Sequence, residues 1–103
     1  MYHLAFFVPE EHAEKVKAAL FEAGAGKLGN YSHCSFESKG LGQFLALSGS
    51  HPFLGSEGEL EKVVELKVEM ICEESYLPAA IAALKASHPY ETPAYYVTKL
   101  LQV

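Results

Sequence analysis

The pattern of hydrophobic and polar residues predicts three strands in this chain. Residues 2–8 are almost entirely apolar and precede Pro9, which is typical of a strand buried on both faces. In residues 64–72 apolar side chains alternate with mostly charged ones, which predicts a strand with one face toward water. Residues 92–100 are rich in tyrosine and valine, which favours a last strand.

Two further segments have apolar residues at helical spacing. The first opens at Pro9 with two glutamates that suit a helix start, and it stops at Gly24 and Gly26. The second is expected to be capped by Ser75 and to end at His88, since the residue before a proline avoids the helical region. The residues expected to be buried on these helices are Ala13, Val16, Leu20, Leu77, Ile81 and Leu84.

The middle of the chain is predicted as a β-hairpin followed by a loop. Residues 30–38 have the pattern of a strand. The Lys-Gly-Leu-Gly sequence at residues 39–42 is typical of a hairpin turn, which makes residues 43–47 the expected return strand. Residues 48–59 are rich in glycine, serine and proline and are expected to form a loop.

The order of these elements predicts an α+β domain of the ferredoxin-like, split βαβ kind. Such a domain has a four-stranded antiparallel sheet with two helices on one face, here with an extra hairpin strand. In this fold the second and last strands occupy opposite edges of the sheet. The 103 residues suit one domain, so residues 1–103 are predicted to form a single ferredoxin-like unit.

Composition and charge narrow the class of protein further. Hydrophobic residues make up 50% of the chain and charged residues 20%, which is typical of a globular domain. The net charge of −5 argues against nucleic acid or an anionic membrane as a partner, because both require clustered lysine and arginine. The two cysteines are far apart, and no apolar run approaches the length of a signal peptide or membrane helix. A cytoplasmic location with free thiols is therefore expected.

Four stretches of the sequence resemble one known domain. They are VPEE at residues 8–11, ALFEAGAG at 19–26, GNYSHCSF at 29–36 and HPYETPAY at 88–95. Together they resemble the insert domain of the Nif-three-like (NGG-interacting factor three-like) proteins, a family of dinuclear-metal hexamers. The resemblance implies a stand-alone version of that insert, with the ferredoxin-like fold of the CutA and PII group and assembly as a trimer.

The same resemblance does not extend any metal-dependent hydrolase activity to this chain. The two-metal site of that family lies in its flanking domains, on residues that this chain lacks. Candidate metal ligands among the 103 residues are histidine, cysteine and acidic side chains. Among these, His33, His88 and Glu91 are the most sensible metal-ligating set, because imidazole and carboxylate are zinc-type ligands.

His33 and His88 belong to segments at opposite edges of the predicted sheet. They would meet only across a subunit boundary, where a neighbouring chain pairs with the edge strand. The predicted ligand-binding residues at this boundary are Tyr31, His33, His88, Tyr90 and Glu91. The expected ligand is a divalent metal, held by His33, His88 and Glu91, or an anionic small molecule.

A structural role is the alternative for the same residues. His88 would then end its helix, where a cationic ring suits the helix dipole, and Glu91 would hold the following turn. Tyrosines on edge strands are often interface packing. The sequence has no G-x-S-x-G elbow and no Walker A loop, so nucleophilic catalysis and phosphate binding by such motifs have no support.

Three roles remain open from the sequence. The leading hypothesis is a non-enzymatic homo-oligomer, with a trimer favoured, that binds a small ligand, a metal ion or a partner protein at its subunit boundaries. The second is a ligand-free scaffold that docks on a larger protein. The third is a small enzyme that uses His33 or His88 as acid or base. A divalent metal is the one cofactor that these residues suggest.

Overall fold

The computed structural model describes residues 1–103 and contains four strands and two α-helices. A short 3-10 turn precedes each helix. The elements in chain order are β1 (Tyr2–Pro9), η1 (Glu10–His12), α1 (Ala13–Glu22), β2 (Phe36–Leu45), β3 (Leu60–Cys72), η2 (Glu74–Tyr76), α2 (Leu77–Ser87) and β4 (Tyr95–Lys99).

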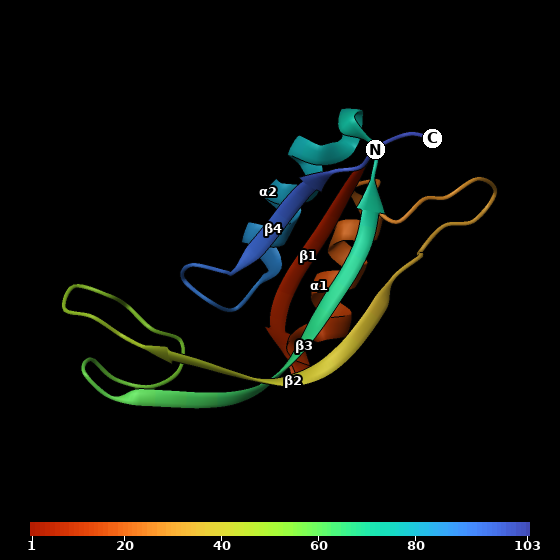
Figure 1. Ribbon diagram of the computed structural model, residues 1–103. Helices are drawn as coiled ribbons and strands as arrows, with labels where there is room; N and C mark the ends of the chain where they lie inside the picture. The colour runs from red at the N-terminus through yellow and green to blue at the C-terminus, as the bar shows by residue number, and fades with distance from the viewer.

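The four strands form one antiparallel sheet in the order β2-β3-β1-β4. Both helices cover the same face of this sheet (Figure 1). The predicted ferredoxin-like fold is therefore confirmed, and so is the placement of the second and last strands at opposite edges. Neither helix is long and apolar enough to span a membrane.

The hydrophobic core lies between the helices and the inner face of the sheet. Because β1 runs through the middle of the sheet, its alternate residues Leu4, Phe6 and Val8 all point into this core and are fully buried. Four of the helix residues predicted to be buried are so: Ala13, Val16, Leu20 and Leu84. The other two, Leu77 and Ile81, are half-buried and pack against the same cluster.

The predicted start of the second helix is wrong in detail. Ser75 makes no capping hydrogen bond and lies inside η2. The backbone itself begins the helix there, because the Tyr76 N–H donates to the Glu73 carbonyl at 3.0 Å. A 3-10 turn of this kind satisfies a free N–H at a helix start without a side-chain cap.

The predicted hairpin at residues 39–42 is also wrong. β2 continues straight through these residues, with Gly40 paired to Glu65 and Gly42 paired to Val63 of the long strand β3. The continuous ladder along β3 keeps both glycines extended, so the chain does not turn. It turns instead within residues 46–59, and no extra hairpin strand is present in the four-stranded sheet.

The strand predicted for residues 30–38 begins only at Phe36. Residues 26–34 form a closed loop, because the Cys34 N–H donates to the Gly26 carbonyl at 2.8 Å. His33 has a left-handed backbone with φ of 59°, which interrupts any extended pairing. The first half of the predicted strand is therefore a loop at the end of the sheet.

The far ends of β2 and β3 project beyond the helices (Figure 1). We call this projection the arm: residues 41–45 of β2, residues 60–64 of β3 and the loop 46–59 that joins them. Leu41 pairs with Val64 and Leu45 pairs with Leu60, so these four side chains share one face of the arm. Their exposed fractions are 68%, 47%, 46% and 55%. The arm therefore presents an apolar face that nothing in the chain covers.

Candidate functional site

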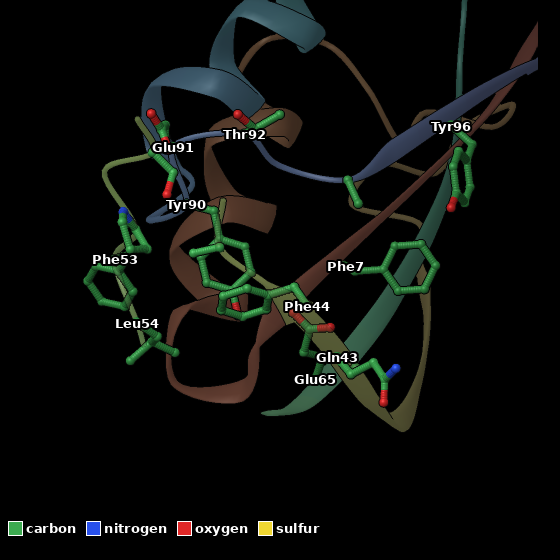
Figure 2. Close-up of a pocket in the computed structure, with 15 residues that line it drawn as sticks. Phe7, Gln43, Phe44, Phe53, Leu54, Glu65, Tyr90, Glu91, Thr92 and Tyr96 are labelled. Atoms are coloured by element: carbon green, nitrogen blue, oxygen red, sulfur yellow. The ribbon is translucent and has the colours of Figure 1, made fainter. Parts of the chain in front are cut away.

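A cleft of about 390 Å³ lies where the arm meets the segment that follows α2 (Figure 2). Its walls come from β1, β2, β3, β4, the arm loop and the α2–β4 connection. The aromatic side chains that line it are Phe7, Phe44, Phe53, Tyr90 and Tyr96. The only charged side chains in its lining are Glu65 and Glu91. The site thus combines aromatic walls with two carboxylates.

His88 holds the wall of the cleft that the α2–β4 connection forms. α2 ends at Ser87, and His88 has the extended backbone that the following proline favours. Its Nε2 lies 2.7 Å from the Phe7 carbonyl, and its Nδ1 lies 3.1 Å from the Tyr90 N–H. Since a carbonyl only accepts and an N–H only donates, Nε2 must carry the proton and Nδ1 must accept. His88 therefore ties the α2–β4 connection to β1 as a neutral ring.

The protonation of His88 follows from its surroundings. The residue is only 6% exposed, and this burial lowers the pKa of its imidazole. The hydrogen bond to Phe7 and the Glu65 carboxylate offset part of that decrease. A second proton, on Nδ1, would point at the Tyr90 N–H, and the hydrogen bond between these two groups would be lost. The expected cationic histidine at the helix end is therefore replaced by a neutral, buried one.

Tyr90 is the central aromatic residue of the cleft. Its ring centre lies 5.0 Å from that of His88, 6.1 Å from that of Phe44 and 6.3 Å from that of Phe53. Its hydroxyl is buried and has no hydrogen-bond partner. Burial raises the pKa of the Tyr90 phenol far above its usual value, and the Glu65 carboxylate raises it further. The Tyr90 hydroxyl is therefore protonated, and it is the one buried polar side-chain atom without a partner.

Glu65 reaches the cleft because Gly42 has no side chain. A Cβ atom at Gly42 would collide with the Glu65 carboxylate, which lies across the neighbouring strand β2. Glycine inside a strand often marks such a close approach. Glu65 takes part in none of the five ion pairs of the chain. Its charge therefore has no cationic partner within the chain.

Glu91 and Phe53 hold the arm loop over the cleft. The Glu91 carboxylate accepts a hydrogen bond from the His51 N–H at 3.0 Å. The Phe53 ring packs edge-on against His12 of η1, with ring centres 5.5 Å apart. Glu91 therefore fastens a distant loop, whereas the structural alternative placed it in its own turn.

Only part of the predicted site is brought together within one chain. Tyr90 and Glu91 line the cleft, and the His88 ring packs against the ring of Tyr90. Tyr31 and His33 lie in the loop of residues 26–34, whose Gly26 N–H binds the Ile71 carbonyl at the other end of the sheet. There the His33 ring packs on Phe21 at 4.8 Å between ring centres.

The predicted metal set requires a second chain. Within this chain no group of three histidine, cysteine or acidic side chains is placed to hold a metal ion. His88 also has no free lone pair, because Nδ1 accepts from Tyr90 while Nε2 donates to Phe7. The convergence of His33, His88 and Glu91 across a subunit boundary stays a prediction.

Sequence reasoning missed most of the aromatic wall. Phe7, Phe44 and Glu65 lie on three different strands, and only the register of the sheet brings them to one cleft. One signal was present in the sequence. Gly42 lies between polar and apolar residues that continue a strand pattern, and glycine at such a position indicates that something approaches the backbone closely.

Comparisons with known proteins relate the chain to one segment of longer proteins. No family model matches it. It is 50% identical over 95 residues to "GTP cyclohydrolase 1 type 2 homolog" of Halalkalibacterium halodurans, an alignment that covers 92% of this chain and 26% of that protein. The chain thus spans about a quarter of the length of the curated relatives that it matches.

Solved structures agree with this relationship. A Bacillus cereus protein related to NIF3 superposes with a TM-score of 0.83 and 43% identity, over 96% of this chain and 25% of that one. CutA1 of Pyrococcus horikoshii superposes with a TM-score of 0.72 and 20% identity, over 100% of this chain and 86% of that one. The second match, at its low identity, shows the fold alone.

Proposed function

Because the chain is homologous to one domain-sized segment of the Nif-three-like proteins and has the CutA/PII-like fold, we propose that it is a homo-oligomeric binding module, with a trimer favoured. In this proposal the arm packs against a second copy of the chain. The cleft at the base of the arm then holds a small ligand at the subunit boundary.

The arm is the observation that carries this proposal. Its four exposed aliphatic residues form a continuous apolar face next to a strand edge. Apolar faces of this kind on soluble domains mark interaction sites. The opposite face of the arm contributes Phe44 to the cleft. Docking of a second copy on one face would therefore fix the geometry of the ligand site on the other.

The sheet edges support the same assembly. β2 and β4 each have a single neighbour in the sheet, so each leaves one row of backbone groups without a strand partner. An open edge of ten residues, as in β2, invites pairing with another chain. Pairing between copies would satisfy these groups and cover the exposed leucines together.

A binding role has more support than an enzymatic one. An acid or base must exchange a proton with its substrate, yet both ring nitrogens of His88 are engaged by backbone groups. His33 lies in a loop away from the cleft. The two cysteines are unpaired, which supports the predicted cytoplasmic location.

Metal binding remains a second candidate in the assembled protein. In that version His33 from one copy joins His88 and Glu91 from another, and zinc or another late divalent ion is bound. His88 would first have to release its Nδ1 from the Tyr90 N–H. Titration of the oligomer with zinc tests this candidate directly, because binding should weaken below about pH 6.5 as histidine is protonated.

The role of the arm can be tested by placing charged residues on its apolar face. Leu41→Asp combined with Leu60→Asp should convert the oligomer to a monomer, because a buried unpaired carboxylate is costly at an interface. The matched control is Leu101→Asp combined with Val103→Asp, which adds the same two charges at exposed apolar residues near the end of the chain. Sedimentation velocity distinguishes the outcomes. An arm variant that sediments like the wild type would refute this interface.

A ligand-free docking scaffold is the rival role, and it predicts a different result. In that case the wild-type chain is a monomer that exposes the arm to a larger protein. The double arm variant would then sediment as the wild type does, both as single chains of 11.3 kDa. The two roles are therefore separated by the wild-type mass alone.

A further inference from the structure

We propose that the cleft binds an organic cation with a flat apolar body, whose positive group lies beside Glu65. This inference rests on the proposed function, since it names the ligand class of the same cleft. It differs from the metal or anion that the sequence suggested. Three features carry it: the charge of the lining, the aromatic walls and an unsatisfied hydroxyl.

The charge of the lining favours a cation. Glu65 and Glu91 both line the cleft, and no lysine or histidine does. Neither carboxylate takes part in any ion pair of the chain. Glu65 is half-buried, so its charge is less well solvated than that of a surface glutamate. An anion would meet two like charges, whereas a cation would supply the missing partner.

The aromatic walls favour an organic cation over a bare metal ion. Three aromatic rings line one part of the cleft. The ring centres of Phe44 and Phe53 lie 6.1 and 6.3 Å from that of Tyr90. Aromatic faces attract organic cations and stack on flat apolar groups. The volume of about 390 Å³ falls in the range of small-molecule sites. A hydrated metal ion would leave these walls without contacts.

The Tyr90 hydroxyl indicates the kind of positive group. It is buried and makes no hydrogen bond of normal geometry, although the Glu65 carboxylate lies near enough to act on it. Both this hydroxyl and the Glu65 carboxylate can accept a hydrogen bond. A protonated amine has several N–H donors and no acceptor, so it can donate to both oxygens at once while the Tyr90 O–H is left to face the Glu65 carboxylate. The geometry therefore fits an aryl-alkyl ammonium ion.

Three indole compounds of nearly equal shape test the charge requirement. Tryptamine is a cation at neutral pH, tryptophol is neutral and indole-3-acetate is an anion. Calorimetric titration of the assembled protein should show tryptamine binding about tenfold tighter than tryptophol, with indole-3-acetate weakest. Equal affinities for tryptamine and tryptophol, a preference for the anion, or no binding of tryptamine would overturn the inference.

A conservative variant locates the positive group. Glu65→Gln keeps the shape of the side chain and should remove the tenfold preference while tryptophol binds as before. Its matched control is Glu69→Gln, which lies on the same strand and the same face but outside the cleft. Loss of the preference in both variants, or in neither, would contradict a site at Glu65. Circular dichroism establishes that each variant is folded.

Light scattering on the same samples keeps this inference separate from the proposed function. An oligomer that does not prefer tryptamine leaves the assembly in place and refutes only the ligand class. A monomer that prefers tryptamine refutes the assembly and retains the ligand class. Addition of zinc to the titration shows whether a metal competes for the same carboxylates, and tight zinc binding that blocks tryptamine would favour the metal instead.

Discussion

The strands β2 and β3 run through both the body of the domain and the arm, but the two regions differ in how far their apolar side chains are buried. Near Cys72, β3 buries Val68 and Met70 under the helices. Near its start, the same strand leaves Leu60 and Val64 about half exposed. The apolar side chains of this one strand are therefore buried in the body and exposed in the arm.

This difference separates what folds the chain from what the chain contacts. The body contains all twelve residues of the main core cluster, and none of them belongs to the arm. The arm is held to the body by its strand pairing, by the Glu91 hydrogen bond and by the packing of Phe53. Stability should therefore depend on the body, while assembly and binding should depend on the arm.

The sharpest contrast comes from truncating one leucine in each region. Leu20→Ala should lower the free energy of unfolding by about 2–5 kcal/mol, because Leu20 is fully buried. Leu41→Ala should change the stability of the monomer by less than about 0.5 kcal/mol, since its side chain is exposed. Urea denaturation at low protein concentration measures both. Equal costs at the two positions would abolish the distinction.

His88 is the next strongest test, because it joins the body to the cleft. His88→Ala leaves the Phe7 carbonyl and the Tyr90 N–H without partners, and each unpaired group costs about 1–3 kcal/mol if it stays buried. His51→Ala is the control, because His51 is exposed and its hydrogen bond to Glu91 comes from the backbone N–H that alanine keeps, so it should be nearly neutral. If His88→Ala unfolds at the same urea concentration as the wild type, the anchoring role is wrong.

The pH dependence of stability gives a smaller effect at the same residue. The pKa of His88 is lower in the folded chain than its usual value, so below about pH 6.5 the unfolded chain binds more protons. Its contribution is therefore complete above about pH 6.5 and declines as the pH falls toward the folded pKa. The urea midpoint of the wild type should fall between pH 7.5 and 5.5 by more than that of His88→Ala. Parallel curves would show that His88 does not titrate differently on folding.

A small effect on stability is also expected at Gly42. Gly42→Ala pushes the flexible Glu65 carboxylate aside, and the alanine also reduces the freedom of the unfolded chain, so stability should change by less than about 1 kcal/mol. Binding should respond instead, since a displaced Glu65 no longer faces the ligand. Tryptamine affinity that is unchanged in Gly42→Ala would show that the position of Glu65 does not matter.

The sequence predicted the body better than the arm, for a physical reason. The alternation in residues 64–72 and the helical stripes around Leu20 and Leu84 arise from burial, and burial is strongest in the body. At Gly40 and Gly42 the local signal favoured a turn, but pairing with β3 overrode it. This pairing is with a strand distant in the sequence, so the local pattern alone did not predict it.

The candidate site shows the same division. Tyr90 and Glu91 were found from the sequence because they lie together in one motif. Phe44 and Glu65 were missed because their proximity depends on strand register and on the small size of Gly42. His33 was assigned to a strand, whereas its left-handed backbone places it in a loop. Short-range patterns therefore located one wall of the cleft and missed the opposite one.

The central claim is that the exposed arm is completed by further copies of this chain. Light scattering of the 103-residue chain at micromolar concentration measures its mass in solution directly. The account predicts a mass of at least two chains of 11.3 kDa, with three chains favoured. A mass of 11.3 kDa at every concentration up to the highest soluble one would contradict it.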